Sequence, residues 1–172
     1  FSFILYFIRL SILHVRNRYQ VIHIHNMPDF LIFSALIPKI MGTPLILDIH
    51  DLMPEVFISK YGEQSNRLIL SLIKLQEKLS CWLADEVITV NSICEMNLIN
   101  RGIPSRKITV VHNYPNAAVF DRNLYSNESN SPRKYFTLIY PGTLAPRYGL
   151  ETVVRALPQL KTQIPEIRLL IF

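Results

Sequence analysis

The sequence is poor in cysteine, with only Cys81 and Cys94 among its 172 residues. They fit neither a C-x-x-C pattern nor a zinc-binding spacing, and two cysteines in a chain of this length do not build a disulfide framework. A disulfide-rich secreted domain is therefore excluded, and we expect a reducing, cytoplasmic compartment with both thiols buried. The glycosylation sequon Asn127-Glu128-Ser129 would matter only in a secreted protein.

Several other signatures are missing. No run of Lys and Arg is interleaved with aromatic residues, so nucleic acid is not an expected partner. The chain has neither a G-K-[S/T] phosphate loop nor a G-x-G-x-x-G loop. It also lacks a D-x-D pair that would hold Mg²⁺ with a diphosphate. We therefore expect no metal and no other cofactor.

Acidic residues are scarce at the N-terminal end, although the chain as a whole carries a net charge of +5. Arg9, Arg16 and Arg18 precede the first acid, Asp29. Residues 1–15 are apolar but too short and interrupted for a spanning helix, which needs roughly 20 apolar residues. A signal peptide would place its basic residues before the apolar run. Two interpretations remain: a core helix with solvent-facing arginines, or peripheral contact of residues 1–18 with the inner face of the cell membrane.

After this segment, apolar strands alternate with helical stripes, which predicts a parallel α/β sheet with right-handed crossovers. The apolar composition of residues 45–49 is typical of a strand covered on both faces. Ser92 and Glu95 stand at capping-box spacing, and we expect Trp82 in the core. The predicted strands are 20–25, 45–49, 86–90 and 107–112, and the predicted helices are 30–41, 65–83 and 92–101.

The composition changes at residues 122–134, which are rich in Asn, Ser and charge and poor in apolar residues. This segment is predicted to be a linker. It would separate an N-terminal domain, 1–121, from a second α/β layer that begins at 135. In that layer we predict strands at 137–140 and 167–172 and a helix at 150–163.

Polar residues at strand ends are the candidate site, because ligands of open α/β sheets bind at the carboxyl ends of the strands. The 45–49 strand stops at His50-Asp51 and passes into Pro54-Glu55. The alternative without a functional role is that Asp51 caps a helix and His50 is an ordinary surface histidine. His23 and His25 share one face of their strand. With His50 and Asp51 they would form a hydrolase-type metal site, but no third ligand stands at a characteristic spacing.

Residues 140–149 join a strand to a helix through a loop that contains Gly142 and Gly149. Such a turn directs backbone N–H groups and a helix N-terminus at one point, which favours anions. Arg147 could add a bidentate contact to a phosphate. A plain connection between strand and helix is the alternative interpretation.

Taken in order, five segments resemble a family-4 glycosyltransferase of GT-B fold, which implies two Rossmann-like domains of parallel sheet. The resemblance also implies retaining transfer, without metal, from a nucleotide-sugar donor to a glycan or lipid-linked acceptor in cell-surface polysaccharide biosynthesis. The segments are Val21–Asn26, Asp48–Glu55, Ala84–Val90, Gly102–Asn113 and Tyr140–Glu151.

The resemblance also assigns residues. His50 would contact the donor sugar, and the donor-binding loop would be formed by Gly142, Thr143, Arg147, Tyr148 and Gly149. Residues on the acceptor side or in the cleft would be His25, Asn26, Asp51, Glu55 and Asn113.

Two departures from the family pattern are visible. Thr143 stands where many members have a basic residue, and the family's glycine-rich N-terminal loop and its glutamate pair would lie outside residues 1–172. We therefore expect this fragment alone to be inactive. The alternatives are a metal-dependent hydrolase that uses His23, His25 and His50, and a non-catalytic sugar- or nucleotide-binding module.

Overall fold

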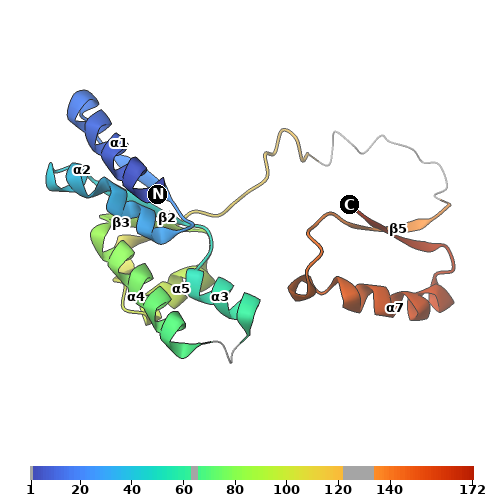
Figure 1. Ribbon diagram of the computed structural model, residues 1–172. Coiled ribbons are helices and arrows are strands. Elements are labelled where there is room, and N and C mark those ends of the chain that lie inside the picture. Colours follow the sequence, from blue (N-terminus) through green and yellow to red (C-terminus); the bar gives the residue numbers. More distant parts are fainter. Residues whose placement is uncertain (1, 63–65, 122–133) are drawn as a thin grey trace. The chain divides into compact units, whose positions relative to one another are not determined.

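The computed structural model describes residues 2–62, 66–121 and 134–172 (Figure 1). The chain divides into two compact units, Phe1–Tyr114 and Pro115–Phe172, each with its own sheet. Apart from residue 134, the predicted linker at 122–134 lies outside the described residues, so its position stays a prediction. The two units are described separately below.

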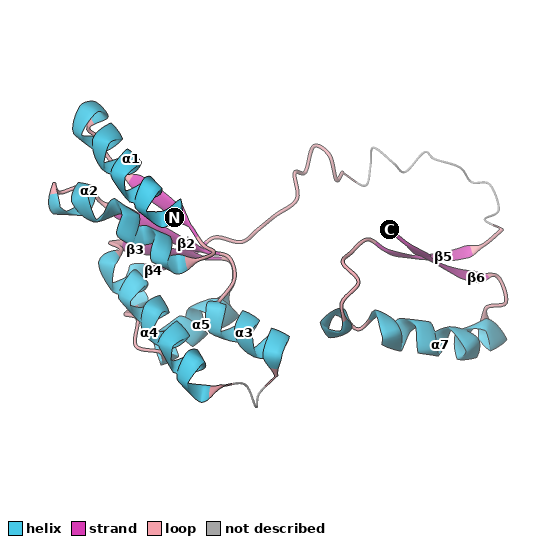
Figure 2. Cartoon of the chain, in the orientation of Figure 1, coloured by secondary structure: helices cyan, strands magenta, loops and turns pink. Residues whose placement is uncertain are grey.

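Unit 1 contains a parallel four-stranded sheet in the order β1-β2-β3-β4 (Figure 2). This confirms the predicted α/β class. The strands are β1 (Ile22–His25), β2 (Leu45–Ile49), β3 (Glu86–Thr89) and β4 (Ile108–Val110). The α-helices are α1 (Ser2–Asn17), α2 (Leu36–Ile40), α3 (Met53–Tyr61), α4 (Arg67–Leu83) and α5 (Ser92–Asn100), and the 3₁₀ helices are η1 (Asp29–Ala35) and η2 (Ser105–Lys107).

The core of unit 1 lies on one face of this sheet. The strand register aligns Leu47 with Val87 and Val87 with Ile108, so alternate apolar residues of neighbouring strands share a face. Residues of η1, α4 and α5 join the same cluster. Its buried members include Ile32, Ala35, Leu45, Leu47, Ile49, Cys81, Leu83, Val87, Leu98 and Ile108.

The other face of β1 and β2 carries His23, His25 and Asp48, because side chains alternate along a strand. The 45–49 strand was expected to be covered on both faces, and four of its five residues are buried. Successive crossovers of one hand, running in one direction along the sheet, bring their helices to the same face. The polar face is therefore the one opposite the core.

Helix α3 was not predicted. It begins at Met53 with Pro54 in its first turn, where a missing N–H costs nothing because the first turn has no internal acceptors. Leu52 is its N-cap and makes no side-chain bond, so the alternative that Asp51 caps a helix is also wrong. The helix predicted at 30–41 is divided into the 3₁₀ helix η1 and the short helix α2.

Three local expectations need correction. Asn91, not Ser92, caps α5: its Oδ1 accepts a bond of 2.9 Å from the Cys94 backbone N–H, so the capping box is not formed. Cys81 is buried, but Cys94 is only partly so. Trp82 is 75% exposed on α4, because its neighbours Cys81 and Leu83 turn toward the sheet. In the turns of α4 that precede Trp82, the side chains of Leu68, Leu72, Leu75 and Leu79 form a further exposed stripe.

Unit 2 is one strand–helix–strand element (Figure 1). Strand β5 (Phe136–Tyr140) pairs in parallel with β6 (Ile167–Ile171), and α7 (Leu150–Gln163) forms the crossover after the short 3₁₀ helix η3 (Pro146–Tyr148). The predicted bounds of the helix are confirmed, and those of the strands are right within one residue. Both units thus have the parallel, Rossmann-like pattern that the sequence predicts.

Candidate active site

Three imidazoles surround one carboxylate at the carboxyl end of β1 and β2. Asp48 Oδ2 lies 3.2 Å from His23 Nε2, 3.1 Å from His25 Nδ1 and 3.3 Å from His50 Nε2. We call these four residues the histidine cluster. The strand register explains the arrangement, because it sets His25 directly beside Asp48, while His50 lies two residues further along on the same face.

The imidazoles are stacked and partly open to solvent. The rings of His23 and His25 are 4.4 Å apart between centroids, and those of His25 and His50 are 5.7 Å apart. The Asp48 side chain beneath them is only 11% exposed. A carboxylate that is nearly removed from water needs polar partners, and the imidazoles supply them. Asp48 was not among the predicted site residues.

Asp48 also changes the argument about metals. His23, His25 and Asp48 each offer a ligand atom, and these atoms lie within 4.8 Å of one another. The sequence argument against a metal rested on the lack of a D-x-D pair and of a third ligand at a characteristic spacing, and the structure adds Asp48 as a third candidate ligand. The third ligand comes from the neighbouring strand, so no spacing within the histidine motif could reveal it.

Asn26 fixes the loop that carries His50. Its side-chain oxygen accepts a bond of 2.9 Å from the His50 backbone N–H, and its Nδ2 donates to the Asp51 carbonyl at 2.5 Å. The same Nδ2 group donates to Asp29 Oδ1 at 3.0 Å. Asn26, predicted as a cleft residue, therefore holds the backbone of two other predicted site residues, the catalytic candidate His50 and the cleft residue Asp51.

A buried group of charges backs this loop. Asp29 is fully buried, and its burial raises the pKa of its carboxyl, while the Asn26 hydrogen bond and the Arg101 charge lower it in part. Arg101 Nε lies 2.6 Å from Glu77 Oε1, and burial raises the pKa of Glu77 to about 7. Arg101 Nη1 also donates to Glu55 at 2.7 Å. Glu55, predicted as a cleft residue, is thus bound to Arg101.

The remaining cleft residue, Asn113, lies exposed in the segment that follows β4. β4 is two strands away from β2 in the sheet, which corresponds to about 10 Å. The structure therefore places Asn113 at the same sheet edge but outside the histidine cluster.

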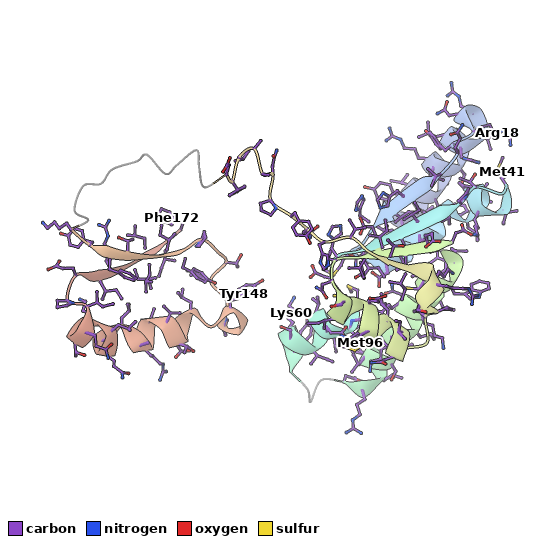
Figure 3. The ribbon with its side chains drawn as sticks, turned by 180° about the vertical axis from the view of Figure 1, so that it is seen from behind. Arg18, Met41, Lys60, Met96, Tyr148 and Phe172 are labelled. Carbon is purple, nitrogen blue, oxygen red and sulfur yellow. The ribbon has the colours of Figure 1, made fainter. Side chains whose placement is uncertain are left out.

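The predicted donor loop lies in unit 2. Tyr140 Oη donates to the Thr143 carbonyl at 3.1 Å and folds its ring over Gly142, where an added Cβ would meet the ring at 3.3 Å. Gly149 has φ +71°, a left-handed conformation that glycine adopts without strain, and leads into α7. Figure 3 shows Tyr148 in the turn before this helix. The side chain of Arg147 lies outside the described residues.

Parallel α/β units with polar groups at the strand ends define a Rossmann-like protein of GT-B type. A family model, Glycosyltransferase Family 4, matches residues 1–116, and the chain belongs to that family. No curated protein matches the chain at a significant level.

Solved structures resemble the chain in fold. A structure of MnaA from S. aureus with UDP aligns with a TM-score of 0.54 at 15% identity, over 99% of this chain and 45% of that one. A UDP-N-acetylglucosamine 2-epimerase from Rickettsia bellii aligns with a TM-score of 0.49 at 14% identity, over 99% and 44%. The chain thus spans less than half the length of these structures.

Proposed function

We propose that this chain is part of a retaining glycosyltransferase that moves a sugar from a nucleotide-sugar donor to a glycan or lipid-linked acceptor. The observation that carries the proposal is the placement of His50. Its backbone is fixed by Asn26 and its ring is directed at Asp48, at the carboxyl end of β2. Family membership over residues 1–116 supports the reaction class, and the MnaA–UDP structure supports a nucleotide sugar as donor.

In the proposed reaction, His50 contacts the donor sugar while the bond to the diphosphate breaks. Positive charge develops on the sugar ring. The Asp48 carboxylate beside the His50 imidazole would stabilise this charge through His50. His25 and Asn26 would contribute to the acceptor side. The two side chains have different tasks, because His25 faces solvent while Asn26 holds backbone groups.

The developing negative charge on the diphosphate is assigned to the loop of unit 2. Gly142, Thr143 and the backbone N–H groups at the start of α7 would bind the phosphates, with Tyr148 and Gly149 shaping the turn. Glu151 in the first turn of α7 is paired with Arg155 Nε at 3.0 Å, which reduces its repulsion toward an anion. Arg147 is proposed as a further phosphate contact.

The proposal is tested by incubating the intact protein with a panel of UDP-, GDP- and ADP-sugars and measuring release of nucleoside diphosphate with and without acceptor glycans. We propose that transfer needs no metal, so full activity after exhaustive chelation is expected. Phosphate-ester or glycoside hydrolysis that is lost on chelation and restored by zinc would favour the hydrolase alternative. Saturable donor binding without turnover would favour a binding module.

We further propose a cytoplasmic enzyme of cell-surface polysaccharide synthesis that contacts the membrane through residues 1–18. Within the described residues, no helix is both long and apolar enough to cross a membrane. Leu10 packs against the core, but α1 also presents an apolar outer face beside Arg9 and Arg16. That exposed face consists of Ile4, Leu5, Ile8, Ile12 and Val15.

Vesicle co-sedimentation tests this contact. Joint replacement of Arg9, Arg16 and Arg18 by Gln should weaken binding to vesicles that contain phosphatidylglycerol, by about 1 kcal/mol per basic residue. The matched control replaces Arg67, Lys74 and Lys78, which are exposed on α4, by Gln. Binding that ignores lipid charge and the α1 replacement would leave α1 as a core helix only.

A further inference from the structure

We propose that the histidine cluster binds one divalent transition metal ion of the zinc type, through His23 Nε2, His25 Nδ1 and Asp48 Oδ2, with a water molecule at the open fourth position. The three atoms come from two neighbouring strands, so the sheet itself brings them together.

The spacing of these three atoms is suitable for one ion, because they all lie within 4.8 Å of one another. Ligand atoms that lie about 2.1 Å from a tetrahedral zinc ion are about 3.4 Å from one another. In this chain His23 Nε2 and His25 Nδ1 lie 3.2 and 3.1 Å from Asp48 Oδ2. Small rotations of the exposed imidazoles would suffice to admit a cation, whereas Asp48 stays fixed in the sheet.

The charges of the cluster point the same way. A divalent cation would be bound by two neutral imidazoles and one carboxylate, which leaves one net positive charge. Imidazole favours zinc, cobalt, nickel and copper, whereas Mg²⁺ and Ca²⁺ prefer oxygen ligands.

Metal binding has a consequence that rests on the proposed function. Asp48 is both a proposed metal ligand and the carboxylate that His50 Nε2 faces at 3.3 Å. A bound metal ion would therefore take this carboxylate away from the imidazole that is proposed to contact the donor sugar. Zinc is therefore expected to inhibit transfer, and chelation is expected to relieve that inhibition. The ion would act as a regulator of the site and not as its cofactor.

Binding is measured on the intact, tag-free protein, so that no added histidines contribute. Titration with Co²⁺ should give the visible absorption of tetrahedral cobalt at one equivalent, and Zn²⁺ but not Mg²⁺ should displace it. His23→Gln removes a ligand that has no part in the proposed transfer. It should weaken zinc binding by about 100-fold or more, because even outer partners of metal ligands are worth about 10- to 100-fold.

The matched control is His112→Gln, which should leave zinc affinity unchanged. It removes an exposed imidazole that follows β4 and lies beside the Tyr114 ring. Asp48→Asn is the second test, in case His23→Gln disturbs folding as judged by circular dichroism. Equal zinc affinity of wild type, His23→Gln and Asp48→Asn, or no saturable cobalt absorption, would overturn the proposal. Cobalt and zinc binding are measured without any substrate. The metal-binding result therefore does not depend on whether the proposed glycosyltransferase activity is found.

Discussion

The histidine cluster of unit 1 and the loop 141–149 of unit 2 both lie at the carboxyl ends of parallel strands, but they are held in different ways. In the cluster, the contacts join residues far apart in sequence: His23 and Asp48 are 25 positions apart, and His50 and Asn26 are 24 apart. In the loop, hydrogen bonds join residues only three positions apart, for example Tyr140 with Thr143 and Gly149 with Pro146.

This difference indicates what each site can do. Contacts between strands and buried charges fix the cluster before any ligand arrives, which is the arrangement that electrostatic catalysis requires. The loop offers mainly backbone groups whose positions follow from its own turn chemistry. We therefore expect changes at the cluster to affect catalysis and stability more strongly than changes in the loop, and the predictions below test this in order of decreasing effect.

The largest effect is expected for His50→Ala. It should lower turnover by at least about 10²-fold, the scale of losing one positioned catalytic group, while circular dichroism stays unchanged because the side chain is partly exposed. Release of nucleoside diphosphate measures turnover, and His112→Ala is the matched control. Transfer at the wild-type rate would reject the catalytic role, and loss of folding would make His50 a structural residue.

The charges behind the cluster should make stability depend on pH. Burial raises the pKa of Glu77 from 4.5 to about 7, so folded protein binds a proton there that unfolded protein releases. The free energy of unfolding should therefore fall as pH rises from about 4.5 to 7, by on the order of 2 kcal/mol. Below pH 4.5 both states are protonated and this contribution is fully present.

Denaturant titrations of Glu77→Gln at several pH values check this expectation. The free energy of unfolding of the variant should no longer fall between about pH 4.5 and 7, because the amide that replaces the Glu77 carboxyl group does not titrate. Glu166→Gln, which removes an exposed carboxylate in unit 2, serves as the control. An unchanged pH slope in Glu77→Gln would mean that the buried charges are fully compensated by Arg101.

Asn26→Ala should have an intermediate effect. It removes the bonds to the His50 N–H and the Asp51 carbonyl, and it leaves the buried Asp29 without this partner. We expect about a tenfold loss of turnover and about 1–2 kcal/mol of stability. Turnover and unfolding are compared with those of Asn100→Ala, an exposed residue of α5. Equal values in both variants would show that Asn26 does not position the loop.

The smallest effect is expected in unit 2. Gly149→Ala forces a non-glycine residue to φ +71°, at a cost of about 1 kcal/mol, although no atom lies within 4 Å of the added Cβ. Gly142→Ala is the counterpart, because its added Cβ meets the Tyr140 ring at 3.3 Å instead. Thermal unfolding of both variants separates backbone strain from crowding. Unchanged stability of Gly149→Ala would show that the turn is not rigid.

The parts of the fold that depend on local chemistry were predictable. β2 and α7 have the predicted bounds, because apolar runs and a helical stripe identify them without reference to other segments. Errors of cap choice are also local: Asn91 precedes Ser92, and either residue type favours an N-cap. Helix α3 was not predicted, although Pro54 stands where proline is favourable, in the first turn of a helix.

The site was only half predictable. The histidines stood out by spacing, but Asp48 lies inside an apolar strand and gains its role from β1. Glu77 and Arg101 were missed for a similar reason, since their pairing joins α4 to the end of α5. A signal was present at Glu77, one turn before the buried Cys81 on the same side of α4. A charge at such a position requires a partner, but the sequence does not say which one.

The exposed Trp82 determines how this protein can be observed. It is the single tryptophan of the chain, and three quarters of it already face solvent in the folded state. Its fluorescence should therefore resemble that of a hydrated indole before and after denaturation. Tryptophan emission would thus change little when the core unfolds. A blue shift, or protection from a soluble quencher, would instead report that another surface has covered the end of α4.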